Sequence, residues 1–180
     1  MHKNKVIIIS GRSGEGKTTL LKQVIDILQE RGIIISGFYA KGKWEKDSRI
    51  NHCLININGK ERIELCTTSK TKGWIKENRF YFNPEAIKAG NQILKKVVES
   101  KPDLIIIDEI GPFELQGKIW ASEFKNILKN YKSPILITAK QKLVKSIVST
   151  FNITNFIELP SSVKPEKIVK LIESDNNLVG

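Results

Sequence analysis

The sequence predicts an α/β protein with a mainly parallel, five-stranded sheet that carries helices on both faces. Three observations support this class. Short β-branched runs alternate along the chain with segments of helical periodicity. The runs at residues 6–9, 104–107 and 134–138 are almost wholly apolar, as is typical of strands covered on both faces. A glycine-rich stretch lies between the first run and the first helical segment.

The elements of the first half follow from these periodicities. In order, we predict a strand at residues 6–9, a helix ending near Gly32, a strand at 33–39, a polar surface loop at 40–51 and a β-hairpin formed by 52–57 and 61–66. Asn58-Gly59-Lys60 would form the hairpin turn.

Two registers are open to this hairpin. A two-residue Asn-Gly turn would pair Ile55 with Arg62, whereas a three-residue loop would pair Ile55 with Ile63. We predict the second register, because it gathers the apolar side chains on one face. It places Cys53 and Cys66 on opposite faces, so we expect no disulfide between them.

The second half continues the alternation. A loop at 67–78 and a short strand at 79–82 precede a helix with a strong start signal, since Asn83 is a good N-cap and Pro84 suits the first helical position. That helix would end near Ser100. The remaining predicted elements are strands at 104–107, 134–138 and 156–159 and helices at 118–131, 141–149 and 165–173.

Length and composition indicate one globular domain covering residues 1–180, with a β-rich insert at about 40–82. The chain has 180 residues, of which 40% are hydrophobic and 27% charged. No apolar run is long enough to cross a membrane, and the basic start is too short for a signal peptide. With two cysteines and no export signal, we expect a cytoplasmic protein.

The formal net charge of +11 raises the question of nucleic-acid binding. The lysines are scattered over almost every segment, so a generally basic surface is favoured over a dedicated DNA or RNA surface. Such a surface would still attract polyanionic nucleotides. His2 and His52 stand apart from any cluster, and no His/Cys metal site is predicted.

The glycine-rich stretch at residues 11–18, Gly-Arg-Ser-Gly-Glu-Gly-Lys-Thr, matches the Walker A pattern G-x-x-x-x-G-K-[ST]. Its glycines let consecutive backbone N–H groups surround a phosphate chain, and the following helix directs its positive end there. Lys17 would reach the β and γ phosphates, and the Thr18 hydroxyl would bind Mg²⁺.

The second functional signal is a pair of acidic residues after the predicted strand at 104–107. Asp108 would hold Mg²⁺ through water, and Glu109 would orient the attacking water or accept its proton. Lys17 and Glu109 are therefore the predicted catalytic residues, and Thr18 and Asp108 the predicted metal ligands. The full predicted nucleotide site comprises Gly11, Arg12, Ser13, Gly14, Glu15, Gly16, Lys17, Thr18, Thr19, Asp108, Glu109, Ile110 and Gly111.

Three stretches resemble a known family. The loop at 11–18, the Gly37-Phe38-Tyr39 step and residues 107–115, Ile-Asp-Glu-Ile-Gly-Pro-Phe-Glu-Leu, are similar to the small cancer-related nucleoside-triphosphatases of archaea, bacteria and animals. The resemblance implies a P-loop NTPase with a RecA-like fold, in which strand 134–138 lies between the two Walker strands and brings Thr138 near the γ-phosphate. It also implies Mg²⁺-dependent hydrolysis of ATP, GTP and other nucleoside triphosphates to diphosphate and phosphate, with loose base selectivity.

The chain departs from this family at two places. Phe113 stands where members often carry methionine, and residues 159–164 lack the Asn-Arg pair found in many members. Lys164 could replace that arginine, although an exposed lysine is the more common situation. Glu114 could brace the loop after Asp108 or contact the water.

Two residues of the insert are further candidates. Arg79 could approach the phosphates, and Trp74 could stack on a base; a surface position and packing against the hairpin, respectively, are the favoured readings.

Three functions fit these signals. Hydrolysis leads, because the Asp108-Glu109 pair is complete. A nucleotide or small-molecule kinase is the second, and a nucleotide-binding adapter with partner-stimulated hydrolysis is the third. Residues 138–141, Thr-Ala-Lys-Gln, lack the guanine-reading Asn-Lys-x-Asp pattern, which argues against a signalling GTPase. The sequence makes no prediction of the oligomeric state.

Overall fold

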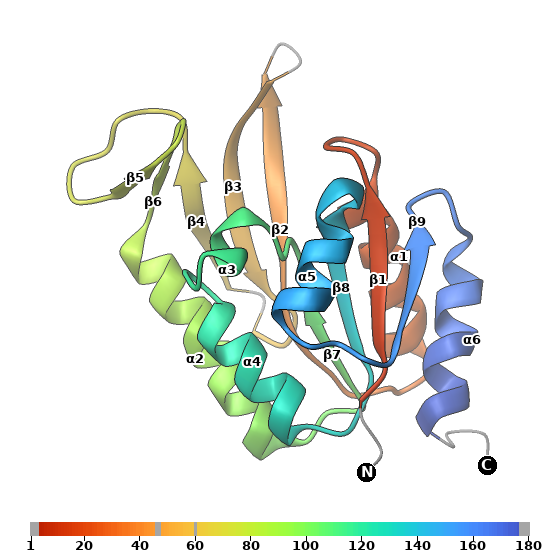
Figure 1. Cartoon of the computed structure of the whole chain (residues 1–180). Coiled ribbons are helices and arrows are strands. Elements are labelled where there is room, and N and C mark those ends of the chain that lie inside the picture. The colour runs from red at the N-terminus through yellow and green to blue at the C-terminus, as the bar shows by residue number, and fades with distance from the viewer. Residues whose placement is uncertain (1–3, 46–47, 60, 177–180) are drawn as a thin grey trace.

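The computed structural model describes residues 4–45, 48–59 and 61–176 and contains a nine-stranded sheet with helices on both faces (Figure 1). The strands are β1 (Val6–Gly11), β2 (Ile35–Glu45), β3 (Ser48–Asn56), β4 (Arg62–Thr67), β5 (Ile75–Glu77), β6 (Phe80–Phe82), β7 (Leu104–Ile107), β8 (Ile135–Lys140) and β9 (Phe156–Pro160). The helices are α1 (Lys17–Glu30), α2 (Pro84–Ser100), α3 (Pro112–Leu115), α4 (Ala121–Asn130), the 3₁₀ turn η1 (Gln141–Leu143), α5 (Val144–Thr150) and α6 (Pro165–Asn176). The strand order is β5-β6-β4-β3-β2-β7-β8-β1-β9.

Five neighbouring strands form a parallel core, as the sequence predicts. β2, β7, β8, β1 and β9 pair in parallel from one to the next. β8 lies between β1 and β7, which confirms the order implied by the family resemblance. The carboxyl ends of β1, β8 and β7 therefore meet at one edge, where α/β proteins bind their ligands.

Both faces of this core are buried, and this explains the wholly apolar strands. On one face, side chains such as Ile7, Ile9 and Ile106 pack with α1 and α6. On the other, Ile8, Ile105 and their neighbours pack with α2, α4 and α5. In Figure 1, α5 lies in front of the parallel strands, while α2 and α4 run side by side.

The antiparallel strands β3, β4, β6 and β5 extend the same sheet beyond β2. The predicted loop at residues 40–51 is wrong over its described part, because β2 continues to Glu45 and β3 begins at Ser48. Backbone pairing between β2 and β3 needs no apolar side chain, so the polar composition of this stretch gave no sign of the two strands. Residues 46–47 of that prediction lie outside the described residues.

The predicted hairpin register is also wrong. Ile55 pairs with Arg62, and the core-facing pair is Leu54 with Ile63. A register shift between His52 and Cys53 then changes which β4 residues lie opposite β3. The prediction took the face of Ile55 as the buried one, whereas Leu54 is the fully buried neighbour. Cys53 and Cys66 are both buried, and no disulfide joins them.

The remaining differences are local. The 67–78 segment contains the short strand β5. The predicted 118–131 helix is shorter in the structure, as α4, and the additional helix α3 precedes it. The α2 prediction is confirmed: the Asn83 side chain accepts a hydrogen bond from the Glu85 amide at 3.0 Å, and the helix ends at Ser100.

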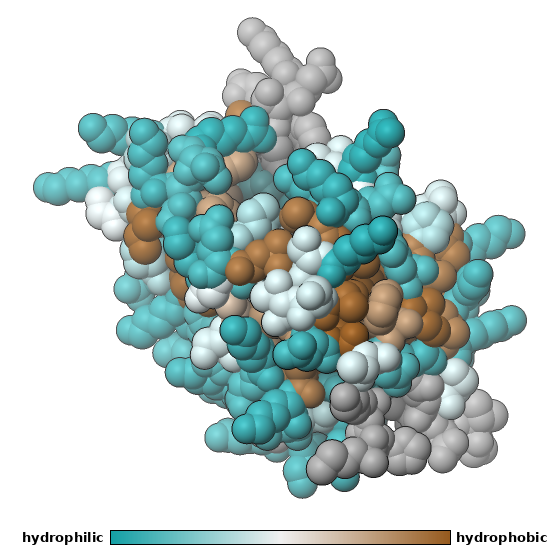
Figure 2. Space-filling view, viewed as in Figure 1, coloured by the Kyte–Doolittle hydropathy of each residue, from teal (hydrophilic) through white to brown (hydrophobic). Residues whose placement is uncertain are grey.

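Figure 2 shows the surface of the molecule from the side seen in Figure 1. Hydrophilic side chains cover most of it, with apolar residues between them. Among the residues whose side chains the structure describes, the large hydrophobic ones that stand exposed are Ile34, Ile75 and Phe156, which lie apart in the sequence. Within the described part of the chain, no helix has the length and apolar character needed to span a membrane.

Candidate active site

The glycine-rich loop lies between β1 and α1, as the sequence predicts. Gly14 and Gly16 both have φ of 82°, in the left-handed region that a side chain disfavours. Gly16 is the N-cap of α1, so the free N–H groups of the first helical turn point into the loop. The loop thus has the backbone geometry that binds anions.

The Lys17 side chain folds over this loop. It is buried, and its Nζ donates to the carbonyl oxygens of Gly11 at 3.2 Å and Arg12 at 2.7 Å. Glu15 closes the same turn, because its carboxylate accepts from the Arg12 amide at 2.6 Å. The ammonium group is therefore held against the loop that would surround a phosphate.

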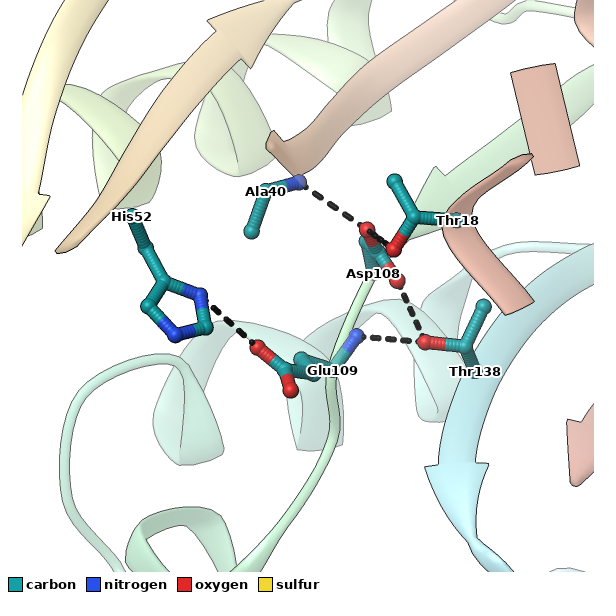
Figure 3. Close-up of polar contacts among 6 residues, drawn as sticks. All are labelled: Thr18, Ala40, His52, Asp108, Glu109 and Thr138. Atoms are coloured by element: carbon teal, nitrogen blue, oxygen red, sulfur yellow. Dashed lines mark hydrogen bonds and ion pairs between the residues drawn. The ribbon is translucent and has the colours of Figure 1, made fainter. Parts of the chain in front are cut away.

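Asp108 follows β7 and joins three other elements (Figure 3). Its Oδ2 accepts from the Thr18 hydroxyl and from the Ala40 amide, each at 3.0 Å, and its Oδ1 accepts from the Thr138 hydroxyl. Only 1% of the residue is exposed. Burial raises the pKa of Asp108, with a further contribution from Glu109, while the three hydrogen bonds favour the charged form.

Glu109 has an unusual backbone, with φ of 65°, although it is not a glycine. Non-glycine residues in this region are uncommon and often mark functional sites. Its amide donates to the Thr138 hydroxyl at 2.8 Å. Its carboxylate points away from Asp108 toward His52, with Oε2 at 3.3 Å from His52 Nδ1 (Figure 3).

The segment after Glu109 is held by Glu114. The Glu114 carboxylate accepts from the Gly111 amide at 2.8 Å, and Ile110 donates to the Thr138 carbonyl at 3.0 Å. The sequence left two roles open for Glu114, bracing the loop after Asp108 or contacting the water. In this geometry Glu114 braces the loop. Glu114 is 3% exposed, and burial raises its pKa to about 7.

A cleft of about 630 Å³ opens beside the loop. Lys17, Asp108 and Glu109 lie among its lining residues, together with Ser13, Ile110 and Gly111. The opposite part of its wall is aromatic and comes from Phe38, Phe80, Phe82, Phe113 and Trp120. The cleft therefore extends from the reactive groups toward the antiparallel strands.

Most predicted site residues come together. Lys17, Thr18, Asp108 and Glu109 meet at one edge of the sheet, and Thr138 hydrogen-bonds both acids there. The backbone of the remaining loop residues surrounds the same place, with exposed side chains at Arg12, Ser13, Glu15 and Thr19. Lys164 is exposed, and Trp74 is half-buried outside the cleft lining. Arg79 lines the cleft and lies over the Phe80 ring.

Two contributors were missed from the sequence. The Ala40 amide lies on β2 and His52 on β3, which pair with each other. The prediction had a loop at Ala40 and a hairpin of the wrong register at His52. His52 follows Asn51 at the start of a predicted strand, and no pattern in the sequence indicated that its side chain would face Glu109.

The donor set suits one hard cation. No group of three or more His, Cys, Asp or Glu side chains with metal-binding geometry occurs among the residues that the structure describes. The Thr18 hydroxyl and the Asp108 carboxylate nevertheless lie 3.0 Å apart beside the loop. Mg²⁺ is commonly bound by one or two such oxygens together with phosphate oxygens and water, so these residues fit it.

The parallel core, the loop at its edge and the acid at the end of β7 define an α/β protein of the P-loop class. Comparison with known families gives the assignment within it. A model of the NTPase family matches residues 6–169, and the chain belongs to that family. It is therefore an enzyme of the nucleoside-triphosphatase type.

Its relatives include proteins named nucleoside-triphosphatase THEP1. The one from Thermotoga maritima is 33% identical over 135 residues, which cover 74% of each chain. The one from Sulfurisphaera tokodaii is 32% identical over 151 residues, or 82% of this chain and 85% of the relative.

Two solved structures share the fold. THEP1 from Aquifex aeolicus has a TM-score of 0.66 at 22% identity, covering 97% of this chain and 98% of that one. A human cancer-related nucleoside triphosphatase has a TM-score of 0.68 at 17% identity, covering 96% and 98%.

Proposed function

We propose that the chain hydrolyses nucleoside 5′-triphosphates, ATP and GTP among them, to diphosphate and phosphate, with Mg²⁺ as cofactor and loose selectivity for the base. The observation that carries the proposal is the hydrogen-bonded set of Thr18, Asp108, Thr138 and Glu109 beside the loop. The names of the relatives support the same chemistry.

The loop and Lys17 would bind the triphosphate. The amides of residues 11–19 would donate to the phosphate oxygens, and the backbone at Ile110 and Gly111 would border the γ-phosphate. The Lys17 ammonium would leave the Gly11 and Arg12 carbonyls for the β and γ oxygens. There it would stabilise the negative charge that develops on the bridging oxygen.

Glu109 would act on the water. The water oxygen forms a bond to the γ-phosphorus, the bond from that phosphorus to the bridging oxygen breaks, and the Glu109 carboxylate accepts the water proton. Its side chain is 39% exposed, so water has access to it.

Thr18 and Asp108 would hold Mg²⁺, which supplies charge neutralisation on the phosphate oxygens. The hydrogen bonds from Ala40 and Thr138 orient the Asp108 carboxylate for this task. They also stabilise its charged form against the effect of burial.

Loose base selectivity is supported by the end of β8. Residues 138–141 are Thr-Ala-Lys-Gln, and the guanine-reading pattern that would end a comparable strand is absent from the sequence. We further propose that residues 1–180 act as one domain in the cytoplasm, with which two cysteines that form no disulfide agree. A role in nucleic-acid binding is not favoured.

One assay tests the proposal. Phosphate release from the purified protein is measured with ATP, GTP, CTP and UTP, with and without magnesium. We expect release from all four with magnesium and little without it. Release of phosphate from none of the four would reject hydrolysis, and equal release without magnesium would reject the cofactor.

The cleft favours one second candidate, a small-molecule kinase. Its aromatic wall continues beyond Glu109 and leaves room for an acceptor beside the γ-phosphate. In the assay above, a kinase would release little phosphate until an acceptor is added. Rapid release with no acceptor present would exclude this candidate as the main activity.

A further inference from the structure

His52 reaches the active site from the antiparallel part of the sheet. It lies on β3, is 7% exposed and places its Nδ1 at 3.3 Å from Glu109 Oε2. Figure 3 shows the imidazole facing the carboxylate, on the opposite side from Asp108 and Thr138. The sequence places it 57 residues before Glu109, so their contact depends on the fold.

A bulge accompanies this orientation of His52. Cys53 pairs with Glu64, but His52 pairs with Cys66, so Leu65 is the extra residue on β4. Bulges bend a strand locally and redirect side chains, and they are frequent near active sites. The Phe80 ring then packs edge-on against the imidazole, with 5.7 Å between the ring centroids. His52 is thus fixed by the bulge on one side and by an aromatic ring on the other.

Glu109 needs restraint at two places. Its backbone is fixed by the hydrogen bond from its amide to Thr138 and by its left-handed φ. The carboxylate itself is half-exposed at the end of a flexible side chain. A second contact is required to hold a carboxylate in one rotamer, because ordering a glutamate costs side-chain entropy.

We infer that His52 is a positioning residue for hydrolysis: Nδ1 donates to Glu109 Oε2 and holds the carboxylate where it meets the attacking water. The antiparallel extension is then part of the active site, since β3 supplies His52 next to the Ala40 amide that β2 supplies to Asp108. The inference rests on the proposed function, because it assigns Glu109 the role given there.

The test uses two substitutions with opposite predictions. His52→Phe keeps a ring that can pack on Phe80 but removes the donor. His52→Asn places an amide N–H close to the position of Nδ1. Ile55→Val, three residues along the same strand, is the matched control, because Ile55 is half-buried and lies outside the cleft lining.

We expect His52→Phe to lower kcat for phosphate release roughly 10-fold or more, as misplacing a catalytic group does, with KM nearly unchanged. His52→Asn should recover most of this loss, and Ile55→Val should match the unaltered protein. Thermal unfolding of each variant checks that the fold is kept.

A double-mutant cycle separates positioning from a structural role. In a Glu109→Gln background, His52→Phe should cost little further, because the group that it positions is already inactive. Additive losses, a loss seen in KM instead of kcat, or wild-type turnover in His52→Phe would each overturn the inference. Those outcomes leave hydrolysis intact, whereas the absence of phosphate release from the unaltered protein rejects the proposed function itself.

Discussion

Single residues at the site combine local backbone features with contacts between distant strands. Thr138 illustrates this, since its one hydroxyl donates to Asp108 and accepts from the Glu109 amide. It therefore ties the acid that would hold the metal to the acid that would act on water. Two predictions belong to this scale.

Glu109→Gln should retain nucleotide binding and lose most turnover, because the amide keeps the size of the side chain but cannot accept the proton. We expect kcat to fall by about 100-fold or more, the usual contribution of a general base. Steady-state phosphate release and equilibrium binding of a fluorescent nucleotide measure the two effects. Unchanged hydrolysis would remove Glu109 from the mechanism.

Thr138→Val should lower both turnover and stability, because the Glu109 amide loses its acceptor and Asp108 loses a donor. Leaving a buried polar group unpaired costs about 1–3 kcal/mol in the free energy of unfolding. Thr138→Ser keeps the hydroxyl and serves as the control. If the valine variant unfolds and turns over like the serine variant, the bridging role is wrong.

At the scale of elements, the short helix α3 depends on a buried carboxylic acid. Glu114 accepts from the Gly111 amide at the start of this helix and holds the turn after Glu109 in place. Burial raises its pKa from 4.5 to about 7, so the folded protein binds a proton there that the unfolded chain has released. This proton makes stability depend on pH.

The sign follows from that difference in proton binding. Between pH 4.5 and about 7 the folded state holds more protons than the unfolded state at this position, so the free energy of unfolding decreases as pH rises. Glu114→Gln should remove up to about 3 kcal/mol of this decrease. Chemical denaturation at a series of pH values measures it, with Glu85→Gln on the exposed side of α2 as control. An unchanged pH profile in the Glu114 variant would contradict the raised pKa.

At the scale of the whole molecule, local signals predicted well and long-range ones did not. The loop at 11–18, the buried strand that ends before Asp108 and the Asn83 cap each depend on neighbouring residues. The position of His52 depends on the bulge at Leu65 and on the register between β3 and β4, which no local pattern determines. The sequence did not reveal that β2 continues beyond residue 39, because most residues at 41–45 are polar.

The whole molecule should be stabilised by its ligand. A non-hydrolysable ATP analogue with Mg²⁺ at 100 times its Kd should add about 2.7 kcal/mol to the free energy of unfolding. For a chain of this length, that corresponds to a rise in Tm of roughly 5–10 °C. The Tm of the Lys17→Ala variant should rise much less at the same concentration of the analogue, since the loop loses its cation. No shift in the unaltered protein would contradict the binding site.

The extension of the sheet also changes what the protein offers to other chains. Without β3 to β6, the outermost strand on that side would be β2, with 11 residues and a row of unpaired amides and carbonyls. Such a border is a template for aggregation. In the structure the border strands are β5, with three residues, and β9, with five and a terminal proline. A protein trimmed of its antiparallel strands should therefore polymerise or precipitate, besides losing His52.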